Sequence, residues 1–557
     1  MQIRLLTIQR YRGIQAFTWK PNAGINCLIG PGDTYKSTVL TAISLLLAPY
    51  PLGACSEFDY YRRRFSDGFE IEAYIGNLDL RALGTEQRLP HFFGWQDNNP
   101  VPLPEGGAET VLRCRVRGNA DLELVYELPV DGSEQPPPFS AGLRRKVMLS
   151  RLAGEERAAR DLRLGTGSLL DRHLKTADMR APVHGAIADA TAAMPIPLPA
   201  QTALTAIRDN FRTAGLPTDL HLGLVPTQGA ALVGMVALAS GATVTEAIPI
   251  ANAGTGTRQV ALLSLSAALA GTAPILVIDE PERGLEPYRQ RSIAKKIAEL
   301  AGAAGQAFLT THAPAILETL VPGSVWRMRP GLEPFRFDGQ TLARLFRSDP
   351  DAFFALVPIL CEGATEVGLL DELLPPMLAL DLDGCGVHLV DGGGQPHVLD
   401  IADAFIAAGI TCGTFLDNET VHAGRRARIQ AQCTQLVWQG AINIEDAVCK
   451  WLSSPGLFAL ISDAAQSTAI ESRYLEDQVY GLIPEVARLG GARDLQTASY
   501  PEPLLRTAFH AAMTTRSWFK SREGGRILAR ALTRIGMPAE IRRQFDDFGA
   551  RLRTSLQ

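Results

Sequence analysis

The chain has 557 residues, with 54 Lys and Arg against 59 Asp and Glu, a net charge of −5, and hydrophobic and charged fractions of 46% and 20%. At roughly 150 residues per domain, this length predicts two to four domains, each able to bury its own core. The composition excludes a disordered tail, a coiled-coil rod and a collagen-like chain, and the mild acidity argues against a histone-like coat on DNA. Residues 501–557 nevertheless hold eleven Lys and Arg and five Asp and Glu, a local charge of +6.

The eight cysteines are scattered, with no CxxC pair, which predicts neither a zinc site nor a disulfide framework. Such cysteine usage is typical of a reducing compartment. The N-terminus lacks the apolar region of a signal peptide, and no apolar run has the length of a membrane span. We therefore expect a soluble, cytoplasmic protein without membrane attachment.

In chain order, the first fifty residues predict a strand at 3–9, a second strand at 24–29 and an apolar helix at 37–47. Short alternating strands with Pro and Gly breaks follow over 70–130, and we interpret them as a β-rich insertion. Helical periodicity with many Arg, Ala and Leu then predicts a helical arm over 140–215.

Short, fully apolar strands separated by helices return over 230–330 and again over 355–420. Strands of this kind are buried on both faces, which is typical of parallel sheets covered by helices. The chain then ends in a mostly helical, basic segment. The sequence thus predicts two successive α/β regions.

The segment Gly30–Thr38, GPGDTYKST, follows an apolar strand and opens a helix. In this context the pattern G-x(4)-G-K-[ST] binds phosphates on backbone N–H groups, so Lys36 would meet the β and γ phosphates and Ser37 would hold Mg²⁺. Tyr35 replaces the second glycine of the pattern, and we expect a right-handed helical backbone there. The alternative is a Gly-rich turn that merely precedes Lys-Ser. The expected phosphate-contacting residues are Gly30, Gly32, Lys36, Ser37 and Thr38.

Two carboxylates, Asp279 and Glu280, end the apolar strand that begins at Ile275. This arrangement suits a water-mediated Mg²⁺ ligand at Asp279 and a base for the attacking water at Glu280, although buried strands also end in ordinary polar caps.

Two further elements fall at suitable intervals along the chain. The Gly-rich loop with Gly254 and Gly256 opens a helix and suits contact with a γ-phosphate from across a dimer. His312 ends the next strand as a candidate γ-phosphate sensor, and a structural histidine is the alternative.

Together these motifs resemble the ATPase head of the ABC/SMC class, and the segments IDEPERGLEP and LTTHAP are similar to those of the OLD (overcoming lysogenization defect) family of ATP-dependent nucleases. The resemblance implies ATP as cofactor and an adenine-contacting arginine, matched here by Arg12. It also implies two heads that sandwich ATP, hence a homodimer or higher oligomer, with the helical arm as a dimerisation element.

Acidic residues also follow three consecutive strands of the second α/β region. Because the carboxyl ends of parallel strands meet at one sheet edge, these acids should converge there, and such a cluster is unfavourable without a metal ion. Carboxylates four residues apart at a helix start share a face and can bridge hard cations. The acids in question are Glu362 and Glu366, Asp391, and Asp417 and Glu419.

This order resembles a TOPRIM domain, the fold shared by topoisomerases, bacterial primases and OLD nucleases, with Glu419 where Asp is more usual. Asn443-Ile-Glu445 and the segment around Lys520 are similar to further OLD elements. The resemblance implies two Mg²⁺ or Mn²⁺ ions about 4 Å apart, with Lys520 neutralising charge in the transition state. The implied metal ligands are Glu362, Glu366, Asp391, Asp417, Glu419 and Glu445.

The basic C-terminus offers a candidate DNA surface, with a solvated helix face as the alternative. Its candidate phosphate contacts are Arg516, Arg522, Arg526 and Arg530.

The expected fold class is α/β, an ABC-type ATPase domain with an inserted helical dimerisation arm, followed by a C-terminal Rossmann-like TOPRIM domain. The expected bounds are 1–140 and 226–345 for the two ATPase lobes, 141–225 for the arm and 355–557 for the TOPRIM domain.

The expected function is an ATP-regulated, metal-dependent DNA endonuclease that serves as an anti-phage effector. A helicase-like or reverse-transcriptase partner encoded in the same operon is also considered. The competing hypothesis is an SMC-like DNA-binding ATPase without nuclease activity.

Overall fold

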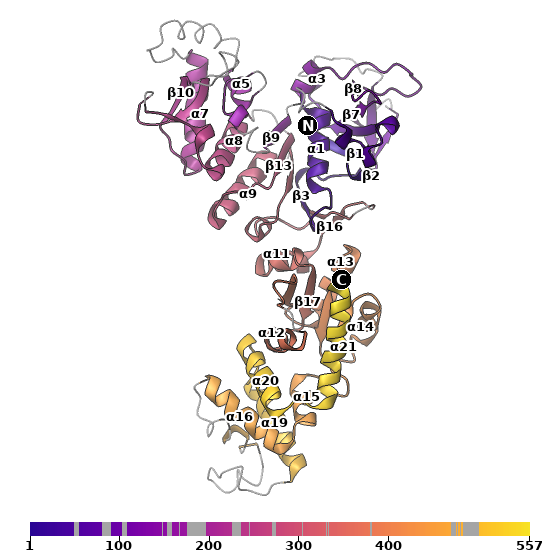
Figure 1. The fold of residues 1–557 in the computed structure, drawn as a ribbon, viewed down its shortest axis with the longest axis vertical. Helices are drawn as coiled ribbons and strands as arrows, with labels where there is room; N and C mark the ends of the chain where they lie inside the picture. The colour runs from indigo at the N-terminus through magenta and orange to yellow at the C-terminus, as the bar shows by residue number, and fades with distance from the viewer. Residues whose placement is uncertain are drawn as a thin grey trace. The chain divides into compact units, whose positions relative to one another are not determined.

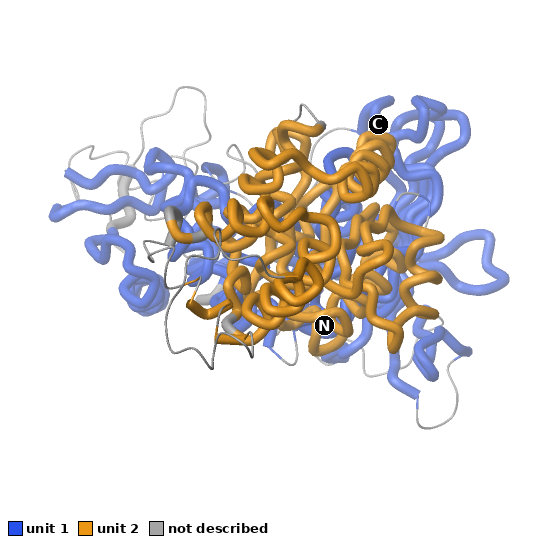
Figure 2. Tube along the Cα trace, turned by 90° about the horizontal axis from the view of Figure 1, so that it is seen from below, with its two compact units in different colours: residues 1–338 blue, residues 339–557 orange. Residues whose placement is uncertain are grey.

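The computed structural model forms two compact units, Met1–Asp338 and Gly339–Gln557 (Figure 2). Each unit has its own sheets and helices (Figure 1). The structure describes residues 1–49, 55–80, 91–102, 108–147, 149–152, 159–165, 168–174, 197–224, 236–243, 246–269, 275–302, 305–329, 331, 333–378, 381–468, 475, 477–479, 481–482 and 501–556.

The first unit begins with an antiparallel sheet of order β2-β1-β4-β7-β5-β6, in which β8 also pairs with β7. The β-rich segment that we expected as an insertion over 70–130 is instead a continuation of this sheet, because β4 pairs along β1 and β7 along β4. The strands are β1 (Gln2–Tyr11), β2 (Ile14–Trp19), β4 (Phe69–Gly76), β5 (Phe92–Gln96), β6 (Asn99–Val101), β7 (Glu109–Gly118) and β8 (Leu124–Glu127).

A second sheet of the same unit has the order β16-β15-β3-β14-β13-β9 and is parallel except at the β15–β16 pair. Its strands β13 and β14 are almost wholly buried, which confirms the expected parallel α/β region. The strands are β3 (Gly24–Ile29), β9 (Leu149–Leu152), β13 (Ile275–Asp279), β14 (Gln306–Thr310), β15 (Val325–Arg327) and β16 (Phe335–Arg336).

Helix α1 (Lys36–Leu47) contacts strands of both sheets, β4 and β7 on one side and β13 and β14 on the other. The two sheets share one core: the ring of Trp19 lies 5.4 Å from that of Phe308 and 5.5 Å from that of Trp326, measured between centroids. Since buried aromatic rings contribute strongly to core stability, this packing holds β2 of the antiparallel sheet against β14 and β15 of the parallel sheet.

The segment expected as a helical arm, 141–225, is only partly helical in its described residues. Its strand β9 joins the parallel sheet beside β13, and β10 (Leu220–Leu224) pairs with β11 (Val236–Ser240), which pairs in turn with β12 (Ile248–Pro249). Its helices are α3 (Ala141–Lys146), α5 (Leu169–Leu174) and α7 (Leu198–Thr213).

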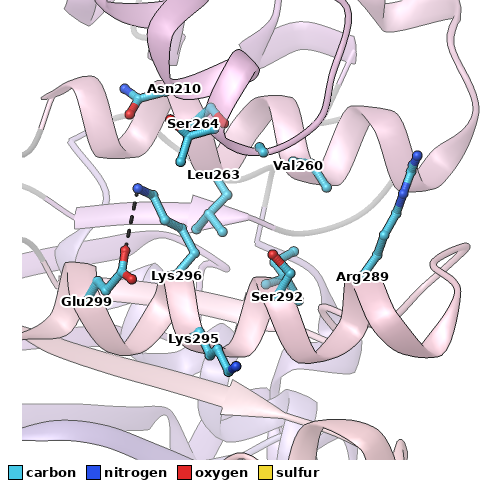
Figure 3. A pocket seen from close by; sticks show the side chains of 12 residues that line it. Asn210, Val260, Leu263, Ser264, Arg289, Ser292, Lys295, Lys296 and Glu299 are labelled. Carbon is cyan, nitrogen blue, oxygen red and sulfur yellow. Dashed lines mark ion pairs between the residues drawn. The ribbon is translucent and has the colours of Figure 1, made fainter.

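Helices α5 and α7 pack against α8 (Thr255–Leu269), so these two helices of the expected arm pack within the first unit. A hollow of about 190 Å³ opens between α7, α8 and α9 (Pro287–Ala301) (Figure 3). Asn210 and Ser264 line it from α7 and α8, and Lys296 of α9 reaches into it while paired with Glu299 at 3.6 Å.

The second unit is built on a parallel sheet of order β18-β17-β19-β20. Its strands are β17 (Val357–Cys361), β18 (Val387–Asp391), β19 (Gly413–Leu416) and β20 (Thr434–Val437). Its helices are α11 (Gln340–Ser348), η6 (Pro350–Phe353), α12 (Ala364–Leu378), α13 (Gln395–Ala407), α14 (Ala423–Gln430), α15 (Ile444–Trp451), α16 (Ser454–Thr468), α19 (Glu502–Arg516), α20 (Arg522–Ile535) and α21 (Ala539–Leu556). Helix α11 and η6 precede the expected domain start at 355 and belong to this unit.

Helices α12 and α20 meet through their backbones, side by side in Figure 1. A Cβ atom built on Gly368 would lie 1.8 Å from the carbonyl oxygen of Arg522, and one built on Gly525 would lie 2.0 Å from that of Thr365. Only glycine fits such close approach. The hydroxyl of Thr365 also donates to the carbonyl of Phe519 at 2.6 Å, so the residues just before α20 are tied to the first turn of α12.

Candidate functional sites

The segment expected to bind phosphate, Gly30–Thr38, runs from the end of β3 into α1, as the sequence predicts. Tyr35 caps α1 with φ 64° and ψ 18°, a left-handed conformation, so the right-handed backbone that we expected at this position is wrong. The turn into the helix requires a positive φ, which glycine supplies without strain and tyrosine adopts at a cost. The Tyr35 ring finds room over Gly13, where a Cβ atom would lie only 2.0 Å from Tyr35 Cε1.

Lys36 lies inside this loop. Its Nζ donates to the carbonyl oxygens of Gly30 at 2.9 Å and Pro31 at 2.7 Å. Burial, and then the positive charge of Arg327, lower the pKa of Lys36, while Glu280 and Asp279 oppose that shift. A cation that is partly desolvated in this way gains most when an anion such as a phosphate joins it.

Asp279, at the end of β13, accepts hydrogen bonds from Ser37 Oγ at 3.0 Å and from Thr310 Oγ1 at 2.5 Å, both on Oδ1. The backbone N–H of Glu280 donates to Thr310 Oγ1 at 3.1 Å, and Glu280 has a positive φ of 49°. Its carboxylate pairs with Arg283 at 2.7 Å. The structure therefore places Ser37 of the first motif within hydrogen-bond distance of Asp279 of the second motif. A Mg²⁺ site shared by these two residues requires this proximity.

His312 follows β14 in the same neighbourhood. Its backbone N–H donates to Glu282 Oε1 at 2.8 Å. Burial, and then the charge of Lys36, lower the pKa of the His312 imidazole, while Glu280 and Asp279 raise it. The imidazole is thus electrostatically linked to the residues expected to bind phosphate and Mg²⁺.

The other expected nucleotide contacts lie as follows. Gly256 packs on the turn after the acidic pair, where its Cβ atom would lie 2.3 Å from the carbonyl oxygen of Gly284, whereas Gly254 has open space around its Cα. Arg12 is paired with Asp59, Nε to Oδ1 at 3.0 Å, and is partly exposed. Contacts of these residues with ATP remain predictions.

Arg327, at the end of β15, was missed in the sequence. It is buried, burial lowers its pKa to about 10, and its charge acts on Lys36. Because β15 pairs with β3, the strand that leads into the loop expected to bind phosphate, Arg327 adds positive potential next to that loop. The available signal was an arginine at the end of an apolar strand.

In the second unit, the sheet edge gathers Glu362 after β17, Glu366 on α12, Asp417 after β19 and Glu445 on α15. Burial, and then the charge of Glu362, raise the pKa of Asp417 to about 8. Burial is also the main cause that raises the pKa of Glu366 to about 7, with added repulsion from Glu362 and Glu445. Close like charges produce shifts in this direction, so the four acids form one cluster.

Lys520 supplies the positive charge of this cluster. Its Nζ lies 2.7 Å from Glu445 Oε1, and Glu445 is almost fully buried. Asp417 Oδ1 and Glu445 Oε2 are buried oxygens that have no hydrogen-bond partner. Buried carboxylate oxygens without a partner are the donor atoms that Mg²⁺ and Mn²⁺ bind, so this residue set fits a divalent cation.

Asp391 and Glu419, which we also expected as metal ligands, are exposed. Asp391 Oδ1 accepts from the backbone N–H of Gly393 at 3.1 Å. Among the residues that the structure describes, no three His, Cys, Asp or Glu side chains are arranged as a ready-made metal site.

The basic residues expected to contact DNA face acids of α12. Arg526 pairs with Asp371 at 2.5 Å, and Arg530 with Glu372 at 3.1 Å. Arg522 lies 3.6 Å from Asp371. The side chain of Arg516 lies outside the described residues. Helix α20 therefore carries arginines whose charge is partly neutralised by acids of α12, and its interpretation as a DNA surface remains a prediction.

Two family models match the chain. Residues 241–318 match "AAA domain, putative AbiEii toxin, Type IV TA system", and residues 353–418 match "Overcoming lysogenization defect protein-like, TOPRIM domain". These matches define the class: an AAA-type ATPase domain and a TOPRIM domain in one chain. The resemblance expected from the motifs is confirmed, since the chain carries an AAA-type ATPase domain and an OLD-like TOPRIM domain.

No curated protein matches the chain. Among solved structures it is similar to an SMC head bound to the C-terminal winged-helix domain of ScpA, with 12% identity, TM-score 0.41, and coverage of 62% of this chain and 100% of that one. It is also similar to an SMC head with an extended coiled coil, bound to a ScpA domain and derived from Pyrococcus furiosus. The identity is 12% and the TM-score 0.40, with coverage of 60% of this chain and 96% of that one. The SMC head domain of Thermotoga maritima is similar with 11% identity and a TM-score of 0.31, with coverage of 61% of this chain and 100% of that one.

Within the described part of the chain, no helix is both long and apolar enough to cross a membrane.

Proposed function

We propose that this protein is an ATP-regulated, metal-dependent DNA endonuclease. The observation that carries the proposal is the cluster of Glu362, Glu366, Asp417 and Glu445 with Lys520, at the carboxyl edge of the sheet in an OLD-like TOPRIM domain. Such a cluster is unfavourable without cations.

The four clustered acids would hold Mg²⁺ or Mn²⁺, in our proposal as two ions, with Asp391 and Glu419 as additional candidate ligands. Bound ions of this kind activate water and stabilise the leaving oxygen of a phosphodiester. Lys520, now paired with Glu445, would donate to the scissile phosphate and reduce its charge in the transition state.

The ATPase unit would regulate cleavage. Lys36 and the loop Gly30–Thr38 would bind the phosphates, Ser37 and Asp279 would hold Mg²⁺, and Glu280 would polarise the attacking water.

Four residues beyond this loop complete the proposed ATP site. His312 would sense the γ-phosphate, Arg12 would contact adenine, and Gly254 and Gly256 would reach the nucleotide of a second copy. The last role requires a homodimer or higher oligomer, which sedimentation with and without ATP tests.

We further propose a cytoplasmic role in defence against phage, with DNA as substrate. A partner of helicase-like or reverse-transcriptase type, encoded nearby, would supply the trigger. Phage plating on cells with and without the gene and its neighbours tests this role.

The direct test is cleavage of a supercoiled plasmid by the purified chain with Mg²⁺ or Mn²⁺. We expect nicked or linear products that disappear in Glu362→Ala and Lys520→Ala. The matched control is Lys450→Ala, because Lys450 is equally half-exposed and also pairs with an acid, Asp446 at 3.0 Å, outside the cluster. A plasmid that stays intact with every metal would contradict the nuclease proposal.

A second candidate is an SMC-like DNA-binding ATPase without nuclease activity. Glu419 favours it, because an exposed carboxylate at this position leaves the usual acidic motif incomplete. That alternative predicts that the protein binds DNA in the presence of ATP and that the DNA stays uncut in Mn²⁺.

A further inference from the structure

Gln395, at the start of α13, bridges two strand ends of the acidic cluster. It is almost fully buried, with 1% of its surface exposed. Its Nε2 donates to Glu362 Oε2 at 3.1 Å and to the backbone carbonyl of Asp417 at 2.9 Å. The backbone N–H of Asp417 donates to the same carboxylate oxygen of Glu362 at 2.9 Å. One amide therefore connects the residue after β17 to the residue after β19.

Arg426, on α14, fixes which way this amide points. Its Nη1 donates to Gln395 Oε1 at 3.0 Å, so the opposite, donating end of the amide faces Glu362. The reversed amide would place its oxygen against the carboxylate and its NH₂ group against a guanidinium, and both contacts are repulsive. Arg426 is itself buried, and helix α13, which carries Gln395, packs against α14.

The same guanidinium also holds the loop after β19. Arg426 Nη2 donates to Asn418 Oδ1 at 2.9 Å, and Nη1 donates to the backbone carbonyl of Glu419. Three acceptors around one planar group require the fork geometry of arginine, which a lysine ammonium cannot reproduce. The backbone of residues 417–419 is thus fixed from α14.

We propose that Gln395 and Arg426 are positioning residues for the divalent cation of the TOPRIM domain. They hold the Glu362 carboxylate and the Asp417 backbone in one fixed relation, which leaves the unpartnered Asp417 Oδ1 available to a cation. The inference rests on the proposed function for the identity of the ligand. Hydrogen-bonded partners behind metal ligands typically change metal affinity 10–100-fold when removed.

The experiment uses the full chain and two readouts that need no DNA. Mn²⁺ is titrated by calorimetry into wild type, Gln395→Ala, Arg426→Ala and Arg426→Lys, and hydrogen exchange of the Asp417 amide is followed in EDTA. We expect Mn²⁺ affinity to fall about 10–100-fold in all three variants. We also expect the Asp417 amide to exchange faster in them, because Glu362 is no longer held against it.

Gln544→Ala is the matched control. Gln544 is also buried in this unit and bridges backbone groups, accepting from the N–H of Gln439 at 3.0 Å and donating to the carbonyl of Glu540 at 3.3 Å. The melting temperature of Gln544→Ala should fall about as much as that of Gln395→Ala. Its Mn²⁺ affinity and the exchange rate of the Asp417 amide should stay at the wild-type values.

Unchanged Mn²⁺ affinity and unchanged Asp417 exchange in folded Gln395→Ala would overturn the inference, as would equal losses in Gln544→Ala. Wild type that binds no Mn²⁺ would overturn the positioning role together with the metal site. Wild type that binds Mn²⁺, with the expected losses in the variants, but cuts no DNA would support the inference and contradict the proposed nuclease alone.

Discussion

Ser37 Oγ donates to Asp279 Oδ1 at 3.0 Å, which joins the first turn of α1 to the end of β13 across most of the first unit's sequence. We expect Ser37→Ala to lower Mg²⁺–ATP affinity about 10- to 150-fold, because an interaction with a charged group contributes about 1.5–3 kcal/mol, while affinity for ATP in EDTA stays unchanged. Lys36→Ala should abolish binding in both conditions. Calorimetry with a non-hydrolysable ATP analogue measures both, and equal losses with and without Mg²⁺ in Ser37→Ala would contradict the shared Mg²⁺ site.

Glu280 should separate ATP binding from hydrolysis. Glu280→Gln keeps the size of the side chain and removes the base, so we expect the hydrolysis rate to fall at least about 100-fold. Affinity for ATP should remain within a few-fold of wild type. Phosphate release at saturating ATP measures the rate, and Glu286→Gln, at an exposed acid six residues on, serves as control. Hydrolysis that persists in Glu280→Gln would assign the base elsewhere.

The contact of Tyr35 with Gly13 predicts a coupled pair. Gly13→Ala should destabilise the first unit by about 1–3 kcal/mol, because the new Cβ overlaps the Tyr35 ring. Tyr35→Gly removes the ring and relieves a left-handed backbone that costs roughly 1–2 kcal/mol in a non-glycine residue. The double variant should therefore regain the stability lost in Gly13→Ala. Urea unfolding of the four proteins forms the cycle, and additive effects would show that the two residues do not interact.

Lys520 and Glu445 predict a stability effect that depends on cations. Lys520→Met leaves the buried Glu445 carboxylate uncompensated, which should cost about 1–3 kcal/mol in EDTA, less than a fully buried pair because Lys520 is half-exposed. Added Mn²⁺ should restore part of the loss. Lys450→Met is the control, with an expected cost below about 1 kcal/mol. No difference between the two variants would mean that Lys520 does not neutralise the cluster.

His388 and Asp349 predict a pH dependence of the second unit. The hydrogen bond that His388 Nε2 donates to Asp349 Oδ1, at 2.6 Å, raises the pKa of His388 against the effect of burial, and the charges of Asp349, Asp351 and Asp383 add to it. A raised histidine pKa stabilises the fold fully below the pKa of an unfolded histidine, about 6.5, and this contribution disappears as pH rises through the folded pKa.

The variant Asp349→Asn should flatten the dependence of unfolding free energy on pH above about 6.5. Chemical denaturation from pH 6 to 9 measures it, with Asp338→Asn as control, since Asp338 lies outside this group and pairs with Arg336. An equal pH slope in wild type and Asp349→Asn would rule out this pair as its source.

Much of the candidate site follows from strand ends. Glu362 and Asp417 follow apolar strands of the second unit's parallel sheet, and the pair Asp279–Glu280 lies at the end of an apolar strand of the first unit's parallel sheet. In each sheet, the residues at the carboxyl ends of parallel strands lie at the same edge. Glu445 and Lys520 were located by family resemblance, and the structure pairs them at 2.7 Å. Asp391 obeys the same strand-end pattern but is exposed, because the pattern fixes the edge and not the direction of the side chain.

Other features depend on contacts that no local pattern contains. The left-handed Tyr35 depends on space over Gly13, which lies in another turn of the chain. Gln395 and Arg426 look like ordinary helix residues in the sequence, and their role arises only when α13 and α14 pack together beside the strand ends. The assignment of β4 and β7 to the first sheet required their pairing with β1, which alternation alone cannot specify.

The backbone contact between α12 and α20 affects how mutational data on this protein should be interpreted. Gly368 and Gly525 carry no functional group, yet any side chain there would push α12 and α20 apart. Glu366 lies on α12 and Lys520 lies just before α20, so the distance between these two residues would change. In a saturation scan of activity, these two glycines would be as intolerant as true catalytic positions. Measuring protein abundance alongside activity would distinguish them, because their variants would lose both, whereas variants of the acids would lose activity alone.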